Sequence, residues 1–452
     1  MYNKFNKIHF IGVGGIGMSG IAELLRRHGY AVSGSDLSKG ETARHLERLG
    51  VEIRLGHDSV NVQGAELVVY SSAIRPDNPE IVAAHQLKIP VITRAEMLAE
   101  LMRLKYGVAV AGAHGKTTTT SMISMLLMEG GLDPTIVVGG RVDHFGGANA
   151  RLGAGDFMVV EADESDGSFN RLSPSIAVVT NMDREHMDHY KTMARLKSAF
   201  LSFMNKIPFY GLTVLCGDDP YLRVLAPRVE RRKKTYGFKA ENGYAISDYL
   251  VSGLGSEFTL RTNTCLEKLR LRVPGKHNAL NAVAAIAVAD ELSIPRSVSV
   301  PALETFQGVQ RRFQKRGAIK GVLFIDDYAH HPTEIRATLQ ATREQFPKSN
   351  IRVVFQPHRY SRVEDLLDQF ATCFKDANAV AITDIYAAGE SPLPGVDGRA
   401  LQDLISAHGT GDTRHVSSAM AGVEAWLAES VEGDIILTLG AGDLPNVYKQ
   451  LF

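Results

Sequence analysis

The sequence is poor in cysteine, in unbalanced charge and in long apolar segments, and each shortage excludes a class of protein. Its three cysteines, Cys216, Cys265 and Cys373, are scattered and form no CxxC pair. We therefore expect no disulfide framework and no zinc knuckle, but reduced and buried thiols. Lys plus Arg number 50 and Asp plus Glu number 50, so the formal net charge is zero. That balance argues against a nucleic-acid-binding protein, which usually carries a basic excess.

Membrane-spanning and targeting segments are also missing. No stretch approaches the roughly 20 apolar residues of a membrane helix. The chain runs from Lys4 directly into a strand-like segment, without a long apolar segment or a small-residue cleavage site. We therefore expect a cytoplasmic protein with no membrane insertion. For its assembly we expect a monomer or a weak homodimer.

Short apolar runs alternate with amphipathic helical stretches along the 452 residues, which predicts α/β domains with mostly parallel sheets. The pattern restarts near Tyr106 and near Arg311. We therefore expect three domains: a Rossmann-like domain over residues 1–105, a central phosphate-loop ATPase-like domain over 106–310, and a Rossmann-like domain over 311–452. Strands are expected at Ile8–Val13, Ala31–Gly34, Leu67–Ser71, Pro90–Ile92, Gly107–Ala111, Phe157–Glu161, Ile176–Thr180, Gly211–Cys216, Gly321–Ile325, Arg352–Phe355, Ala379–Thr383 and Asp434–Leu439.

A first glycine-rich loop, Gly12–Gly17 (GVGGIG), follows an apolar strand and precedes a helix. Glycines at these positions let backbone N–H groups approach a diphosphate at the positive end of the helix. Asp36 ends the next expected strand, where an acidic side chain usually binds a ribose. Alone, the loop is compatible with a nicotinamide enzyme, another diphosphate ligand or a merely tight turn.

A second loop, Gly112–Thr117 (GAHGKT), also lies between a strand and a helix. In such loops backbone amides cradle phosphate, the lysine reaches the outer phosphates and the threonine binds Mg²⁺. Val110 stands where the first glycine of the usual motif would be, so this is a variant phosphate loop, and a chance turn is the alternative. A nicotinamide oxidoreductase has no use for the second loop. Two phosphate loops instead suggest a ligase or kinase with one nucleotide-linked substrate and ATP.

Four of the six residues of Glu161–Asp166 (EADESD), at the end of a strand, are acidic. Because parallel strands end at one edge of a sheet, these carboxylates can face the phosphates and bind Mg²⁺; a solvated acidic turn is the alternative. His186 follows the next strand. Its spacing is compatible with a metal ligand, a phosphate contact or a helix cap.

Histidines and arginines follow two strands of the third domain. Asp326–Pro332 (DDYAHHP) contains two adjacent histidines, which is unusual for a plain loop, although His330 could also be a core or capping residue. Arg359 and Arg362 follow the strand that ends at Phe355. Paired arginines make charge-assisted contacts to carboxylates and phosphates, and a solvated basic turn is the alternative.

Together these motifs resemble the Mur ligase family over essentially the whole chain. The residues that carry the resemblance are Gly12–Gly20, Ser33–Asp36, Ser71–Ile74, Asp77–Glu80, Arg94–Leu101, Gly112–Thr119, Glu161–Asp166, Asn181–Asp188, Pro274–Asn281, Gly308–Phe313, Asp326–Glu334 and Phe355–Arg362. One departure is Ala113, where the family often has threonine. The resemblance implies an ATP-dependent ligase that joins L-alanine to the carboxylate of UDP-N-acetylmuramate through an acyl-phosphate, in peptidoglycan synthesis.

The resemblance also implies roles for individual residues. The residues implied to bind ATP are Gly112, His114, Gly115, Lys116, Thr117, Thr118, Asn278, Asn281, Arg312 and Asp327. Those implied to bind the UDP substrate are Gly14, Gly15, Ile16, Gly17, Asp36, Ser71 and Ser72. Those implied around the amino acid and the muramoyl carboxylate are Tyr328, His330, His358, Arg359 and Arg362.

Metal and catalytic roles are implied in the same way. Thr117 and Glu161 would coordinate one Mg²⁺, and His186 would join Glu161 at a second. Lys116, His186, His330 and Arg359 are the implied catalytic residues, with His330 our candidate to take the proton of the amine. Some relatives carry a carbamylated lysine near the second metal, and the sequence leaves open whether Lys191 or Lys197 has that role.

Two other functions share some of these motifs. A recycling ligase of the same superfamily adds a whole tripeptide to the same UDP-sugar, and Ser71–Ile74 with the first glycine loop favours the alanine-adding branch over it. A UDP-sugar sensor without turnover would not need to keep Lys116, Thr117, Glu161 and His186 together.

Overall fold

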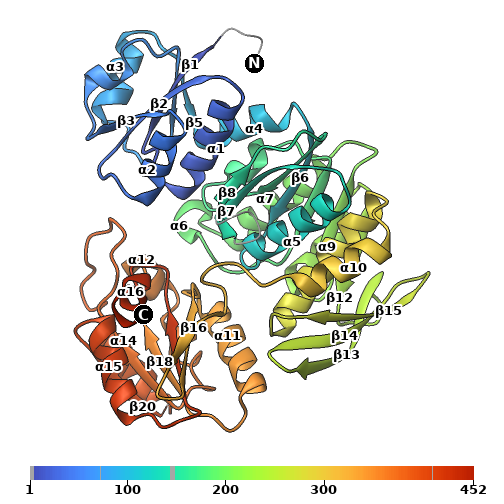
Figure 1. The fold of residues 1–452 in the computed structure, drawn as a ribbon, viewed down its shortest axis with the longest axis vertical. Coiled ribbons are helices and arrows are strands. Elements are labelled where there is room, and N and C mark those ends of the chain that lie inside the picture. The colour runs from blue at the N-terminus through green and yellow to red at the C-terminus, as the bar shows by residue number, and fades with distance from the viewer. Residues whose placement is uncertain (1–4, 72, 143–147, 410) are drawn as a thin grey trace. The chain divides into compact units, whose positions relative to one another are not determined.

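Three sheets follow one another along the chain (Figure 1). The computed structural model describes residues 5–71, 73–142, 148–409 and 411–452. Over these residues the sheets have five, ten and six strands, and most of the strand pairs are parallel. The predicted α/β class with mostly parallel sheets is therefore confirmed.

The first sheet has the strand order β3-β2-β1-β4-β5, and all of its pairs are parallel. Its strands are β1 (Lys7–Ile11), β2 (Ala31–Asp36), β3 (Glu52–Leu55), β4 (Leu67–Tyr70) and β5 (Val91–Thr93). Its helices are α1 (Ile16–Arg27), α2 (Glu41–Arg48), η1 (Ser59–Val62), α3 (Pro79–Gln86) and α4 (Arg94–Met102). The order reverses between β1 and β4, so the glycine loop after β1 lies at the switch point where such sheets bind ligands.

A buried polar network ties this sheet to α3 through Glu80. The Glu80 carboxylate lies 2.9 Å from His9 Nε2 and 3.0 Å from His57 Nδ1. It also accepts hydrogen bonds from Ser35 Oγ at 2.8 Å and Asn61 Nδ2 at 3.0 Å. Burial alone raises the pKa of Glu80, but the hydrogen bonds from His9, Asn61, Ser35 and His57 outweigh it and lower the pKa to about 2.

The central sheet has the order β15-β14-β13-β12-β11-β10-β6-β9-β7-β8. Its strands are β6 (Tyr106–Ala111), β7 (Thr135–Val142), β8 (Ala148–Arg151), β9 (Phe157–Glu161), β10 (Ile176–Val179), β11 (Leu212–Cys216), β12 (Lys233–Gly237), β13 (Tyr244–Ser252), β14 (Gly255–Arg261) and β15 (Leu266–Leu271). Its helices are α5 (Lys116–Glu129), η3 (Ser168–Arg171), α6 (Met187–Tyr190), α7 (Met193–Asn205), α8 (Pro220–Leu225), η4 (Ala226–Arg228), α9 (Lys276–Glu291) and α10 (Arg296–Thr305). Helix α5 is buried from Thr117 to Leu127, and it contacts β6, β7, β9 and α10. Burial on several sides fixes the phosphate loop at its N-terminus.

The third sheet has the order β16-β17-β21-β18-β19-β20, and only β16 pairs antiparallel among its described strands. Its strands are β16 (Gln314–Ile319), β17 (Val322–Asp327), β18 (Ile351–Phe355), β19 (Ala379–Ile382), β20 (Asp412–His415) and β21 (Ile435–Leu439). Its helices are α11 (Pro332–Gln345), α12 (Tyr360–Asp365), α13 (Leu367–Phe370), α14 (Gly398–Ala407), α15 (Ala419–Glu429) and α16 (Pro445–Leu451).

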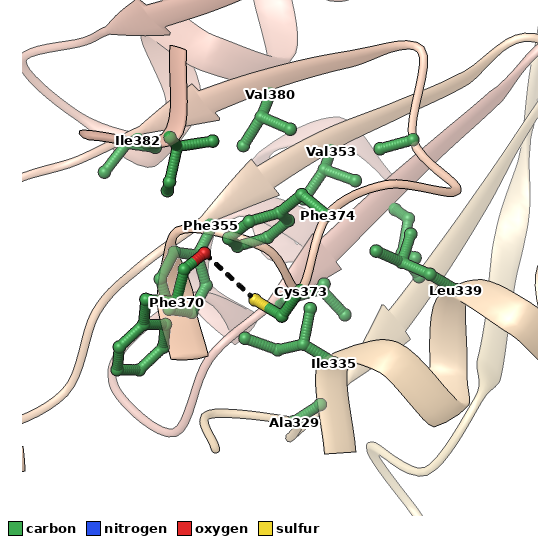
Figure 2. Packing of buried hydrophobic residues seen from close by; sticks show 14 of the residues in the cluster. Ala329, Ile335, Leu339, Val353, Phe355, Phe370, Cys373, Phe374, Val380 and Ile382 are labelled. Carbon is green, nitrogen blue, oxygen red and sulfur yellow. Dashed lines mark hydrogen bonds between the residues drawn. The ribbon is translucent and has the colours of Figure 1, made fainter. Parts of the chain in front are cut away.

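Aliphatic and aromatic side chains pack together in a buried cluster of this unit (Figure 2). Phe355 packs against Phe370 and Phe374, with ring centroids 5.7 and 5.3 Å away. Cys373 Sγ lies 3.5 Å from the carbonyl oxygen of Phe370, and burial raises the pKa of its thiol. All three cysteines are free; Cys216 is buried like Cys373, whereas Cys265 is only partly buried. The prediction of burial therefore holds for two of the three cysteines.

Clustering of residue contacts divides the chain into two compact units. The first comprises the described residues up to Ser247 with Thr259–Leu269 and Leu280–Phe306. The second comprises Asp248–Phe258, Arg270–Ala279 and Gln307–Phe452. Among the described helices, none combines the length and the apolar character needed to cross a membrane.

Removing the charge of Glu80 tests the buried network. The pKa of Glu80 lies below its ordinary value of 4.5, so its stabilising effect is present above pH 4.5 and is lost as the pH falls towards 2. We expect Glu80→Gln to lower the free energy of unfolding by about 3 kcal/mol at pH 7. The difference in this free energy between the unsubstituted protein and Glu80→Gln should narrow below about pH 4.5. Urea unfolding from pH 7 to pH 3 measures this, with Glu52→Gln, whose side chain is 66% exposed, as the control. A difference in free energy of unfolding that does not change with pH would contradict the account.

Candidate active site

The loop Gly112–Gly115 connects β6 to α5, and its backbone leaves no room for side chains at either end. Gly112 has φ +140°, and a Cβ there would lie 2.0 Å from Thr180 Oγ1. Gly115 has φ +80°, and a Cβ there would lie 2.7 Å from Asn281 Oδ1. Both glycines are therefore required by close contacts as well as by backbone conformation.

Polar residues after β10 hold the middle of the loop. The His114 backbone N–H donates to Asn181 Oδ1 at 2.8 Å, and the His114 carbonyl accepts from Thr180 Oγ1 at 2.6 Å. His114 Nε2 lies 3.0 Å from the carboxylate of Asp183. The sequence analysis gave Thr180 and Asn181 no role, although Thr180 ends a predicted strand and Asn181 follows it. The hydrogen bonds of Thr180 and Asn181 with the His114 backbone fix the conformation of the loop.

Lys116, the first residue of α5, is held by the loop and by the acidic segment after β9. Its Nζ donates to the carbonyls of Gly112 at 2.6 Å and Ala113 at 3.2 Å, and lies 2.8 Å from Glu164 Oε1. Burial lowers the pKa of Lys116, but the negative charges of Glu164, Glu161 and the nearby Glu185 outweigh it and raise the pKa above its ordinary value. Lys116 is therefore a fixed positive charge. Thr117 and Thr118, which are predicted to bind ATP, follow it and are buried.

The four acids of Glu161–Asp166 have four different partners. Glu161 Oε2 accepts the backbone N–H of Gly139 at 2.8 Å. Asp163 pairs with Arg94 at 2.9 Å and Glu164 with Lys116 at 2.8 Å. Asp166 accepts the backbone N–H of Ser168 at 2.9 Å. The segment is thus an ordered part of the site.

His186 lies with Glu164 and Glu185 in a group that could bind a cation. Its Nε2 is 3.7 Å from Glu164 Oε1 and 3.9 Å from Glu185 Oε2, and one ligand atom from each residue lies within 4.8 Å of the others. Glu164 Oε2 is buried and accepts no hydrogen bond from any described residue. Two carboxylates and an imidazole with a spare buried oxygen fit a divalent cation such as Mg²⁺. Glu161, the predicted partner of His186, is not in this group.

The first glycine loop lies against the central sheet across a pocket of about 380 Å³. Residues of the first sheet and residues of the phosphate site line it together; they include Gly15, Gly17, Ser71, Arg94, Lys116 and Glu161. The structure therefore brings the two loops that the sequence predicted separately to one pocket within the first unit.

Two predicted UDP-binding residues, Gly14 and Asp36, contact each other at this loop. The Gly14 N–H donates to Asp36 Oδ2 at 2.9 Å, and a Cβ on Gly17 would lie 2.8 Å from Arg94 Nη1. Gly15 is the N-terminal cap of α1, which begins at Ile16. The side chain of Ile16 and all of Ser72 lie outside the described residues. The sequence analysis missed Arg94 as a site residue, although it belongs to a motif of the resemblance.

The two asparagines predicted to bind ATP differ in their surroundings. Asn281 Oδ1 accepts a hydrogen bond from Thr119 Oγ1 at 3.1 Å and lies against the phosphate loop at Gly115. Asn278, in the second unit, donates through Nδ2 to the Pro274 carbonyl at 2.7 Å.

In the second unit, Asp327 shapes the loop that follows β17. Its carboxylate accepts the backbone N–H groups of Phe313 at 2.7 Å and Ala329 at 2.8 Å. Burial raises the pKa of Asp327 to about 6 against the opposing charge of Arg312. The Arg312 guanidinium lies 5.2 Å from the Tyr328 ring centroid. These contacts order the predicted ATP-binding residues of this unit.

His330, His358 and Arg362 form a second group in this unit. The rings of His330 and His358 are 5.8 Å apart, and Arg362 Nη1 lies 3.2 Å from His358 Nδ1. Burial, together with His330, Arg362, Arg359 and Arg311, lowers the pKa of His358 to about 3, so this imidazole is neutral at pH 7. Arg359 has φ +70°, a strained conformation of the kind found at functional sites. The group suits a bound carboxylate.

Tyr386 extends this group, and the sequence analysis missed it. Its ring stacks on His358, with centroids 5.5 Å apart and planes at 10°. Its backbone carbonyl accepts the Arg359 N–H at 2.9 Å. Tyr386 comes three residues after the predicted strand Ala379–Thr383, and this position after a strand end is the signal that could have indicated it.

Three family models match successive parts of the chain: "Mur ligase family, catalytic domain" over residues 7–106, "Mur ligase middle domain" over 110–289, and "Mur ligase, glutamate ligase domain" over 311–442. The chain belongs to the Mur ligase family. The resemblance inferred from its motifs is thus confirmed.

Individual Mur ligases are similar to the chain over nearly its full length. UDP-N-acetylmuramate–L-alanine ligase of Sorangium cellulosum is 53% identical, over 99% of this chain and 96% of that protein. The crystal structure of UDP-N-acetylmuramate-alanine ligase MurC from Thermotoga maritima has a TM-score of 0.83 at 32% identity, over 98% of this chain and 97% of that one. A murein peptide ligase from Psychrobacter arcticus has the same fold, with a TM-score of 0.72 at 24% identity, over 98% of each chain.

Adding a side chain at Gly17 of this Mur ligase tests the part of the pocket that the first glycine loop and Arg94 line. Because a Cβ there would meet Arg94 Nη1 at 2.8 Å, we expect Gly17→Ala to displace Arg94 and weaken binding of UDP-N-acetylmuramate by about tenfold. Calorimetric titration measures this. Gly40→Ala is the matched control, since nothing lies within 4 Å of a Cβ there. Unchanged affinity in Gly17→Ala would show that Arg94 and the loop do not bind the UDP-sugar.

Proposed function

We propose that this chain is an ATP-dependent ligase that joins L-alanine to the carboxylate of UDP-N-acetylmuramate, with release of ADP and phosphate, in the synthesis of peptidoglycan precursors. One observation carries the proposal: the first glycine loop and Lys116 of the phosphate loop line the same pocket. A substrate carrying a diphosphate on the first loop would present its far end to Lys116. Relatives that are more than half identical over nearly the whole chain are named for this reaction.

The three parts of the chain have separate roles in this proposal. Residues 1–105 bind the UDP part through the loop around Gly15, with Asp36 and Ser71. Residues 106–310 bind ATP through the loop ending at Lys116 and Thr117, with Asn281 beside it. Residues 311–452 bind the amino acid and close over ATP through Arg312 and Asp327.

The chemistry requires activation of a carboxylate. A carboxylate and an amine do not condense at neutral pH, because the departing oxygen is a poor leaving group. We infer that the muramoyl carboxylate attacks the γ-phosphate of ATP, and that the amine of alanine then displaces phosphate from the acyl-phosphate through a tetrahedral intermediate. Lys116 and His186 stabilise the negative charge on the phosphoryl group during its transfer.

We expect the cation to be Mg²⁺, with two ions bound per chain. Thr117, Glu161 and His186 would hold them, and Glu164 and Glu185 add oxygens of the kind Mg²⁺ prefers. When bound, the ions neutralise charge on the phosphates. Of the two lysines considered for carbamylation, Lys197 lies with its Nζ 4.7 Å from the Tyr221 ring centroid, and Lys191 is the C-terminal cap of α6.

Residues of the second unit supply the groups for the amine. Arg359 and Arg362 bind the carboxylate of alanine in this proposal, and the neutral His358 leaves the positive charge to these arginines. His330 takes the proton that the amine loses on attack. Because ATP and UDP-sugars are cytoplasmic metabolites, we place the reaction in the cytoplasm, with a monomer or weak homodimer as the working form.

Phosphate release identifies the amino substrate. With ATP, Mg²⁺ and UDP-N-acetylmuramate present, we expect L-alanine to stimulate release strongly and the tripeptide L-Ala-γ-D-Glu-meso-diaminopimelate not to. Lys116→Ala is expected to lose turnover by at least about a thousandfold while still binding the UDP-sugar. Stimulation by the tripeptide alone would identify a recycling ligase. If neither L-alanine nor the tripeptide stimulated phosphate release, although the UDP-sugar bound, the protein would be a sensor.

A further inference from the structure

All the hydrogen-bonding capacity of Lys116 is used within the chain. An ammonium group has three donors. The three acceptors of Lys116 Nζ are the carbonyls of Gly112 and Ala113 and the carboxylate of Glu164, at 2.6, 3.2 and 2.8 Å. A phosphate that binds Lys116 must therefore displace at least one of them.

Glu164 is the acceptor that a phosphate would displace. The two carbonyls belong to the phosphate loop itself, whereas Glu164 comes from the segment after β9 and carries the same sign of charge as a phosphate. Its side chain is 3% exposed. Its carbonyl oxygen accepts Tyr190 Oη at 2.5 Å and the Gly167 N–H at 3.0 Å. The backbone is thus anchored, and the carboxylate is fixed where it competes for the lysine.

The surroundings of Glu164 offer the carboxylate a second position. Its Oε2 accepts no hydrogen bond from the described residues. His186 and Glu185 lie with Glu164 in the group that fits a cation, and His186 Nε2 is 3.7 Å from Glu164 Oε1. A carboxylate released from Lys116 would be left buried without a counter-charge, and an unpaired buried charge is costly. A cation bound between Glu164, Glu185 and His186 would supply that counter-charge.

We propose that Glu164 is a positioning residue that holds Lys116 in the nucleotide-free protein and exchanges this lysine for a divalent cation when phosphate binds. The inference rests on the proposed role of Lys116 in ATP binding. It makes binding of the nucleotide depend on the cation through this chain's own charges, in addition to any contact between the cation and the phosphates.

Calorimetric titration of ADP with and without Mg²⁺ tests the exchange. We expect Glu164→Gln to tighten Mg²⁺-free ADP binding by about tenfold, the scale on which one charge-assisted hydrogen bond changes an equilibrium. The enhancement of binding by Mg²⁺ should shrink by a similar factor. Glu185→Gln, which removes the same charge from the same group, is the matched control and should change Mg²⁺-free binding much less. Binding of adenosine, which has no phosphate, should be unchanged in both variants.

Several results would overturn the proposal. Mg²⁺-free ADP binding that is unchanged or weaker in Glu164→Gln would show that Glu164 does not compete for Lys116. If Glu185→Gln tightened Mg²⁺-free ADP binding as much as Glu164→Gln does, the effect would be one of general charge and not of competition between Glu164 and phosphate for Lys116. If Glu164→Gln does not fold, Glu164→Asp, one methylene shorter, should shift Mg²⁺-free binding in the same direction, and no shift there would equally overturn it. Failure of the unsubstituted protein to bind ADP at all would instead refute the proposed function.

Discussion

Three neighbouring parallel strands of the central sheet, β10, β6 and β9, end at the same edge, and the segments that leave them meet there. The loop to Lys116 follows β6, the acidic segment follows β9, and the segment to His186 follows β10. The Lys116–Glu164 ion pair at 2.8 Å joins the first two, and the 3.7 Å approach of His186 to Glu164 brings in the third. The chemistry of the site depends on this common edge, because neither the lysine nor the acids could be fixed by a single loop.

Close packing around glycines then determines what can approach the edge. Gly112 and Gly115 let the phosphate loop lie against Thr180 and Asn281. Gly17 does the same for Arg94 at the first loop. A side chain at Gly17 would displace Arg94, which lines the pocket of about 380 Å³ that the first loop shares with Lys116. A ligase that passes a phosphoryl group to a UDP-linked carboxylate needs such a shared pocket, since the two substrates must meet.

The sequence predicted the parts of the molecule that carry strong local patterns. Buried strands such as Phe157–Glu161 were found because their apolar runs are uninterrupted, whereas edge strands with few buried residues, such as β3 and β20, were not. The glycine loops were recognisable from spacing, but the pairing of side chains was not. Four acids in six residues do not reveal which one meets Lys116, and Arg94 pairs with Asp163 across 69 residues. Such pairings depend on tertiary packing.

The central claim is that ATP phosphorylates the carboxylate of the UDP-sugar in the pocket shared by the two loops. The most direct test uses UDP-N-acetylmuramate labelled with ¹⁸O in its muramoyl carboxylate, turned over with ATP, Mg²⁺ and L-alanine. If the carboxylate attacks the γ-phosphate, one carboxylate oxygen leaves with the phosphoryl group, and mass spectrometry of the released phosphate will show one ¹⁸O atom per molecule. Amide formation with unlabelled phosphate would contradict the account.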